Sequence, residues 1–137
     1  MNILVLGANG QLGRCLAEQL TETSFDTVFT SRAEIDITDF FSTRIKITQI
    51  NPWVVINATA YTEVDKAEIE SEHAHLVNHL AVANIAKICA DIGSVLILPV
   101  VLILNRRLNN HLLWFSPSFL YINLIYFFFM KIKHIKF

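Results

Sequence analysis

The sequence predicts an α/β fold in which helices cover both faces of a parallel sheet. A continuous apolar run, Ile3 to Leu6, is too short for a helix core and typical of a strand buried on both faces. Further runs of this kind alternate with helical patterns through short connections, as in parallel sheets. A glycine-rich turn directly follows the first run. These observations predict a Rossmann-like doubly wound sheet over residues 1–97.

The turn after the first strand carries three glycines spaced three apart. Gly7 allows a sharp turn, Gly10 lets the backbone approach a pyrophosphate, and Gly13 lets the next helix pack closely on the strand. Leucines at four-residue spacing predict a helix that begins near Gln11 and points its positive end at the phosphates. We therefore expect a nucleotide cofactor here, the alternative being an ordinary strand-turn-helix.

A second strand is expected at 27–30, followed by Ser31 and Arg32. In such folds an acid at this tip favours NAD, whereas an arginine accepts the 2′-phosphate of NADP. No acidic residue occupies this tip, so NADP is favoured. The alternative is a solvated arginine on a turn.

The segment 34–39 alternates apolar and polar residues, so we expect an edge strand and then a helix capped by Thr38 or Asp39. Apolar positions for that helix are Phe40, Phe41, Ile45 and Ile50. With right-handed crossovers the strand order becomes 3-2-1-4, in which strand 3 is this edge segment and strand 4 is residues 53–58.

The end of that fourth strand, residues 57–62, lies at the carboxyl edge, where open α/β sheets bind ligands. A long helical pattern over 74–92 then closes at Gly93, and another strand begins near Val95. His75 and His79 share a helix face, but no third ligand is placed, so surface histidines are favoured over a metal site.

The formal net charge of −1 gives no reason to expect nucleic-acid binding. All twelve acidic residues precede Val95, and residues 95–137 carry only basic charges. Cys15 and Cys89 show no metal-ligand spacing and are expected to be buried, reduced thiols. No secretory signal pattern is present at the N-terminus, so we expect a cytoplasmic protein.

Five segments, in order and at matching spacing, resemble the dTDP-4-dehydrorhamnose reductases, NADPH-dependent members of the extended short-chain dehydrogenase/reductases. The segments are 2–13, 36–39, 52–62, 64–68 and 77–81. The resemblance implies reduction of dTDP-4-dehydro-L-rhamnose to dTDP-L-rhamnose with NADPH, NADH being possible. The dTDP-sugar is the expected partner of the intact family member, and a homodimer is a possible assembly. The resemblance leaves any divalent ion unknown.

The resemblance also assigns cofactor contacts residue by residue. The pyrophosphate is assigned to Gly7, Asn9, Gly10, Gln11 and Leu12, with Gly13 completing the glycine pattern. It assigns the 2′-phosphate to Ser31 and Arg32, the adenine to Asp36 and Ile37, and the ribose and nicotinamide side to Ala58, Ala60 and Tyr61. Thr59 departs from the family, in which alanine is usual.

The family pattern stops near Leu98. A Ser-Thr-Asp-Tyr motif and a later Tyr-x-x-x-Lys pair, which supplies the proton, are both missing, so no catalytic residue is assigned. The apolar, acid-free tail of residues 98–137 is interpreted as an out-of-frame translation of an interrupted gene. Val101-Leu102-Ile103 is compatible with an offset frame that encodes Ser-Thr-Asp.

Two alternatives stay open. Leu112 to Met130 is mostly apolar and is followed by lysines, which is typical of a membrane span, although its serines and Pro117 weaken this interpretation. A second alternative for the whole chain is a non-catalytic NADP-binding module or regulatory subunit, or a related nucleotide-sugar epimerase or reductase.

Overall fold

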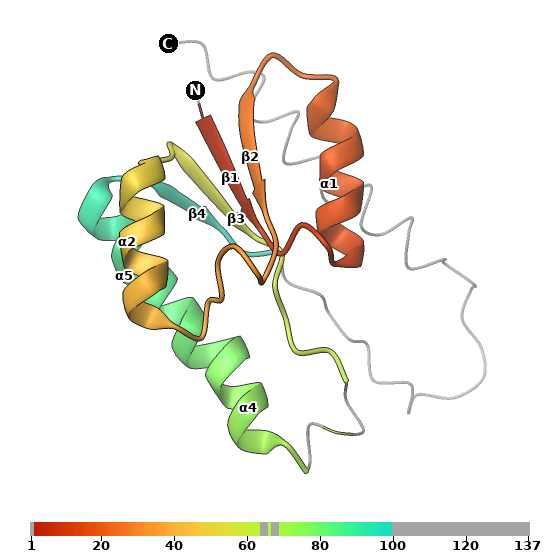
Figure 1. Cartoon of the computed structure of the whole chain (residues 1–137), viewed down its shortest axis with the longest axis vertical. Coiled ribbons are helices and arrows are strands. Elements are labelled where there is room, and N and C mark those ends of the chain that lie inside the picture. Colours follow the sequence, from red (N-terminus) through yellow and green to blue (C-terminus); the bar gives the residue numbers. More distant parts are fainter. Residues whose placement is uncertain (1, 64–65, 67–68, 100–137) are drawn as a thin grey trace, which may run out of the picture. The chain divides into compact units, whose positions relative to one another are not determined.

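A computed structural model describes residues 2–63, 66 and 69–99. Its centre is a four-stranded, fully parallel sheet in the order β2-β1-β3-β4 (Figure 1). The strands are β1 (Asn2–Leu6), β2 (Asp26–Thr30), β3 (Val54–Asn57) and β4 (Val95–Ile97). The α/β, Rossmann-like fold class is thereby confirmed.

Helices cover both faces of this sheet. The helices are α1 (Gln11–Thr21), α2 (Phe40–Ile50), α4 (Ser71–His75), the π-helix η1 (Leu76–Leu80) and α5 (Ala81–Ile92). Figure 1 shows α1 on one side of the sheet and α2 with α5 on the other. Every connection between neighbouring parallel strands therefore crosses over through a helix, as the alternating pattern predicted.

The main core lies between the sheet and the α2–α5 layer. Leu4 and Leu6 of β1 and Val55 of β3 pack there with Ile47, Ile85 and Ile88 of the helices, and each of these side chains is fully buried. The alternate strand residues Ile3 and Val5 are also buried, on the α1 side, together with Leu16 and Leu20 of α1. Because β1 is buried on both faces, its sequence is a continuous apolar run and not an alternating one.

The predicted edge strand at 34–39 is wrong. This segment forms turns, in which the N–H groups of Glu34 and Ile35 donate to the carbonyl oxygen of Ser31 at 3.1 and 3.0 Å. The alternation of apolar and polar residues resembles that of a strand because Ile35 and Ile37, each 5% exposed, both pack into the main core. They do so from turns and not from an extended backbone. The strand order therefore begins at β2, and the predicted order is correct only from the second position onward.

Helix α2 was predicted at the right place, but of its predicted apolar positions only Ile50 packs against the main core, whereas Phe40, Phe41 and Ile45 are exposed. Asp39 caps it, since its side chain accepts a hydrogen bond from the N–H of Ser42 at 3.0 Å. The buried residues are Thr43 and Ile47, whereas Phe41 is 78% exposed. Thr43 is tolerated in the core because its hydroxyl donates to the carbonyl oxygen of Asp36 at 2.9 Å.

The two cysteines differ in environment. Cys89 is buried among the residues of the main core, as expected, and burial raises the pKa of its thiol. Cys15 is exposed, so the expectation that it is buried is wrong. Helix α1 presents Gly13, Leu16 and Leu20 to the sheet, and Cys15 falls outside this stripe.

The long helical pattern before β4 is interrupted by a π-helix. α4, η1 and α5 follow one another without a break from Ser71 to Ile92, and Gly93 ends α5 in the left-handed region at φ 74°. His75 and His79 are both exposed and stack with ring centroids 4.9 Å apart. No group of three metal-ligating side chains occurs in the part of the chain that the structure describes.

The interpretations of the C-terminal tail, both the shifted reading frame and the membrane span at 112–130, fall outside the described residues. Among the described helices none combines the length and apolar character that crossing a membrane requires. The division of the chain at residue 97 stays a prediction.

Candidate functional site

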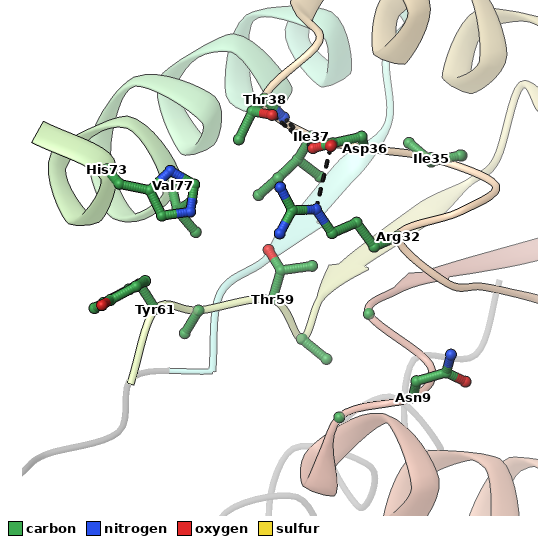
Figure 2. A pocket seen from close by; sticks show the side chains of 14 residues that line it. Asn9, Arg32, Ile35, Asp36, Ile37, Thr38, Thr59, Tyr61, His73 and Val77 are labelled. Carbon is green, nitrogen blue, oxygen red and sulfur yellow. Dashed lines mark hydrogen bonds and ion pairs between the residues drawn. The ribbon is translucent and has the colours of Figure 1, made fainter. Parts of the chain in front are cut away.

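A cleft of about 270 Å³ lies at the carboxyl edge of the sheet, around the ends of β1, β2 and β3 (Figure 2). This volume is just below the usual range for ligand pockets, about 300–1,000 Å³. The lining residues come from the turn after β1, the turns after β2, the end of β3 and the start of the long helix: Gly7, Asn9, Gly10, Arg32, Ile35, Asp36, Ile37, Thr38, Ala58, Thr59, Ala60, Tyr61, His73 and Val77.

The turn after β1 is anchored to the tip of β2. Gly7 adopts φ 84°, a conformation that side chains disfavour, and the N–H groups of Gly7 and Ala8 both donate to the carbonyl oxygen of Thr30 at 2.9 Å. Helix α1 then begins with Gly10 as its N-cap, which supplies no side-chain hydrogen bond. The first-turn amides of Gln11, Leu12 and Gly13 therefore lack a cap, as in anion-binding helix N-termini.

The other two glycines are needed for different reasons. A Cβ at Gly13 would lie 2.3 Å from the carbonyl oxygen of Gly7, so only glycine lets α1 approach the turn. Gly10 has φ −72° and ψ 166°, which any residue adopts, and a Cβ there would lie 3.3 Å from the same oxygen. A side chain at residue 10 would therefore need only a small shift of the turn, and the exposed position of Gly10 in the lining of the cleft favours close approach by a ligand.

The tip of β2 contains an acid that the sequence pattern did not reveal. Both the N–H and the hydroxyl of Ser31 donate to Oε2 of Glu34, at 2.7 and 2.8 Å. These hydrogen bonds lower the pKa of the Glu34 carboxyl, the one from the Ser31 backbone first, so it is ionised at neutral pH. The expectation that no acid occupies this tip is therefore wrong, because the Glu34 carboxylate, three residues farther along the chain, lies against Ser31.

Arg32 lies across the cleft from Thr59, as Figure 2 shows, and its Nε is 3.2 Å from Oδ2 of Asp36. The other carboxylate oxygen of Asp36 accepts hydrogen bonds from the N–H and the hydroxyl of Thr38, at 3.0 and 2.7 Å. These contacts lower the pKa of Asp36, the Thr38 hydroxyl contributing most. The Arg32 side chain is mainly exposed, at 71%, which leaves it able to contact a ligand.

The end of β3 is shaped by Asn57 and Thr59. Oδ1 of the buried Asn57 accepts hydrogen bonds from the N–H of Thr59, at 3.1 Å, and from its hydroxyl. A Cβ at Gly7 would lie 2.9 Å from Cγ2 of Thr59, so the side chain of Thr59 covers the glycine turn. The threonine that stands in place of the usual alanine is thus accommodated without an unpaired hydroxyl.

Tyr61 is held in the cleft by the π-helix. Oδ1 of Asn78 accepts a hydrogen bond from the N–H of Tyr61 at 2.8 Å, and Nδ2 of Asn78 donates to its carbonyl oxygen at 3.1 Å. The Tyr61 ring meets His73 edge-on, and its hydroxyl donates to Glu70 at 2.9 Å. Burial, followed by the contact with Glu70, raises the pKa of Tyr61 to about 12, so the phenol stays neutral.

The structure brings most of the predicted cofactor contacts together. Nine of them line the cleft: Gly7, Asn9, Gly10, Arg32, Asp36, Ile37, Ala58, Ala60 and Tyr61. Gln11, Leu12 and Gly13 lie in the first turn of α1, and Ser31 lies beside the cleft against Glu34. Their role in cofactor binding stays a prediction.

A family model described as RmlD substrate binding domain matches residues 1–99. The chain belongs to the RmlD family. The dTDP-4-dehydrorhamnose reductase of Mycolicibacterium smegmatis is 42% identical over 95 residues, which is 69% of this chain and 28% of that protein. The reductase of Escherichia coli K12 is 37% identical over 98 residues, 69% of this chain and 32% of that protein. This chain therefore spans about a third of the length of such relatives.

Solved structures of dTDP-4-dehydrorhamnose reductases agree with the fold. A dTDP-4-dehydrorhamnose reductase from Clostridium acetobutylicum matches with a TM-score of 0.68 and 34% identity over 70% of this chain and 34% of that chain. The reductase from Bacillus anthracis, solved in complex with NADP, matches with a TM-score of 0.67 and 33% identity over 69% of this chain and 34% of that chain.

Five lining residues of this RmlD family member were not predicted: Ile35, Thr38, Thr59, His73 and Val77. Thr38 and Thr59 flank predicted positions, so proximity in sequence was a usable signal. His73 and Val77 reach the cleft from α4 and η1, and no local pattern indicates this. The spacing Ser-x-x-Glu at residues 31–34 is a capping-box signature and could have revealed the contact of Glu34 with Ser31.

Proposed function

We propose that this chain is the cofactor-binding part of an NADPH-dependent dTDP-4-dehydrorhamnose reductase, which reduces dTDP-4-dehydro-L-rhamnose to dTDP-L-rhamnose. The observation that carries the proposal is the uncapped N-terminus of α1, which opens beside a cleft at the carboxyl edge of a parallel sheet. Main-chain N–H groups and a helix dipole at this place suit a pyrophosphate.

The remaining parts of a dinucleotide are assigned to the rest of the cleft. The apolar side chains of Ile35 and Ile37 suit the adenine, the guanidinium of Arg32 suits a 2′-phosphate, and Tyr61 marks the nicotinamide side. The complex of the Bacillus anthracis reductase with NADP supports this choice of cofactor. The bound cofactor would supply hydride.

The chain on its own is proposed to bind cofactor without turnover. None of its tyrosines has a lysine four residues later, so the pair that donates a proton to the sugar carbonyl in this family is missing from the 137 residues. A non-catalytic NADP-binding module is the second candidate function, and it rests on the same observation. The dTDP-sugar, and a second copy of the chain, are proposed partners of the intact reductase.

Titration of the full chain with NADPH by isothermal titration calorimetry tests the binding proposal. We expect saturable binding at one site. At an NADPH concentration of 100 times the dissociation constant, the free energy of unfolding should rise by about 2.7 kcal/mol. Gly10→Val places a branched side chain where the pyrophosphate approaches and is expected to weaken binding at least about tenfold.

Gly93→Asn is the matched control, because Gly93 lies before β4 at the opposite edge of the sheet and asparagine tolerates its left-handed conformation. A folded protein that shows no NADPH binding would disprove the proposal. Consumption of NADPH with dTDP-4-dehydro-L-rhamnose at an ordinary enzymatic rate would disprove the absence of turnover.

A further inference from the structure

The glycine turn after β1 contains an Asn-Gly pair, Asn9 and Gly10, and this dipeptide occurs once in the 137 residues. Main-chain attack on an asparagine amide is least hindered when glycine follows, because glycine has no Cβ to shield its nitrogen. Both residues are exposed and both line the cleft. We propose that Asn9 is a deamidation site in the folded chain, and that the carboxylate formed there weakens the binding of a dinucleotide. The second part rests on the proposed function.

The reaction needs water as its only co-reactant. The main-chain nitrogen of Gly10 loses its proton to solvent and attacks Cγ of Asn9. An N–Cγ bond forms, the Cγ–Nδ2 bond breaks, and the amide group takes up a proton and leaves as ammonia. Water then adds to either carbonyl carbon of the resulting five-membered succinimide and opens the ring. The product is an aspartate or an isoaspartate at position 9, and nothing is oxidised or reduced.

The structure distinguishes Asn9 from the other asparagines that it describes. One of these, Asn51, precedes Pro52, whose nitrogen carries no hydrogen and cannot form the succinimide. Within the described part of the chain the Asn9 carboxamide forms no side-chain hydrogen bond, and Figure 2 shows it apart from the other labelled side chains. It can therefore turn toward the Gly10 nitrogen. Four other asparagines hold their carboxamides in hydrogen bonds with other residues: Asn2, Asn57, Asn78 and Asn84.

One contact opposes the reaction and makes its rate depend on a ligand. The N–H of Gly10 donates to the carbonyl oxygen of Gly7 at 3.0 Å, so the nitrogen can react only while this hydrogen bond is open. A ligand that binds the closed turn lowers the population of open turns, as a ligand of the native state lowers the population of unfolded protein. A pyrophosphate bound at the start of α1 should therefore slow the deamidation of Asn9.

The product places a negative charge beside the proposed pyrophosphate site. Residue 9 directly precedes Gly10, the N-cap of α1, so a carboxylate there lies next to the uncapped amides of the first turn. It repels a pyrophosphate and competes with it as an acceptor for those amides. An isoaspartate also adds one atom to the main chain of the turn. Both products are expected to weaken NADPH binding by about tenfold or more.

The test incubates the full chain in mildly alkaline buffer, with and without NADPH. Peptide mass spectrometry then follows the conversion of the Asn9 amide to a carboxylic acid. A synthetic peptide of residues 4–14 sets the length of the incubation. We expect clear conversion of Asn9 in the protein, several-fold slower with NADPH, while the peptide that contains the buried Asn57 stays unchanged. An equal rate with and without NADPH, in a protein that binds NADPH, would overturn the protection by the closed turn.

Asn9→Gln is the matched control, because attack on a side chain one carbon longer must form a less favourable six-membered ring. By calorimetry, the NADPH affinity of the wild type should fall about tenfold during the incubation, whereas the affinity of Asn9→Gln should stay constant. Freshly prepared Asn9→Asp should show a comparable loss of affinity. Circular dichroism of the incubated wild type should show that it is still folded, so that unfolding does not account for the loss.

Three outcomes separate this inference from the proposed function. Persistence of the Asn9 amide in the protein, while the synthetic peptide loses its own, overturns the deamidation site. Unchanged NADPH affinity of the converted protein and of Asn9→Asp overturns the effect of the charge and leaves the proposed function intact. Absence of NADPH binding to the fresh wild type overturns the proposed function together with the loss of affinity, whereas the conversion of Asn9 is still measured by mass.

Discussion

Replacing Gly13 by alanine is expected to destabilise the domain severely. The new Cβ would lie 2.3 Å from the carbonyl oxygen of Gly7 and 2.7 Å from Cα of Ala8, both main-chain atoms, whereas ordinary contacts begin at 3.4 Å. Helix α1 would have to move by about 1 Å, which also loosens the packing of Leu16 and Leu20 against the sheet. Overpacking of this kind lowers the free energy of unfolding by about 1–3 kcal/mol, and by more where the clash is with main-chain atoms. We therefore expect the free energy of unfolding to fall by at least about 3 kcal/mol.

Thermal and urea unfolding followed by circular dichroism measure this effect. A loss of 3 kcal/mol corresponds to a fall in Tm of roughly 12 to 24 °C for a domain of this size. Gly10→Ala is the control on the same turn, because its Cβ would lie 3.3 Å from the nearest atom and its backbone conformation is open to alanine. It should cost only about 0.5–1 kcal/mol, since alanine is a poor N-cap. Equal stability of the two variants would refute the argument that Gly13 is required by backbone contact.

Two further perturbations test the polar contacts of the cleft. The Thr38 hydrogen bonds hold the pKa of Asp36 below its ordinary 3.8, so the stability they contribute is present above that value and is lost as the pH falls through the folded-state pKa. Urea unfolding of Asp36→Asn should therefore depend less on pH in the acid range than that of the wild type, and parallel curves would contradict this. Asn78→Ala removes both hydrogen bonds to the Tyr61 backbone and should cost about 1–2 kcal/mol and several-fold in NADPH affinity. Asn84→Ala on α5 is its control, and an equal effect of both substitutions on NADPH affinity would count against a specific role for Asn78.

The elements that the sequence predicted well are those specified by neighbouring residues. The run Ile3 to Leu6 is buried on both faces, so hydrophobicity alone marks it as a central strand. The glycine turn is equally local, because the positive φ of Gly7 and the crowding at Gly13 arise within residues 7–13. Gly93 ends α5 for the same reason.

The elements that were missed depend on contacts between distant segments. Thr43 is buried because a carbonyl oxygen seven residues earlier accepts its hydroxyl, which no apolar pattern reveals. Ile35 and Ile37 alternate as a strand would, but they reach the core from turns. The contact between Asn78 and Tyr61 spans 17 residues and depends on a π-helix, whose wider turn has no sequence signature of its own.

The cleft has two kinds of hydrogen-bond donor, which lie at different places: paired side chains at the tip of β2 and uncapped amides at the start of α1. The two kinds should contribute differently to the binding of a dinucleotide. At the β2 tip, Ser31 and Arg32 are already paired with Glu34 and Asp36, so a ligand there must exchange one hydrogen bond for another and gains little net free energy. The first-turn amides of α1 have no capping side chain, so an anion that reaches them replaces only water. Affinity for a dinucleotide should therefore come mainly from the pyrophosphate at α1, while the tip discriminates between ribose and phosphorylated ribose at little cost in binding. Changes at Gly10 should accordingly weaken the binding of NADPH and NADH equally, and changes at Glu34 should affect the two differently.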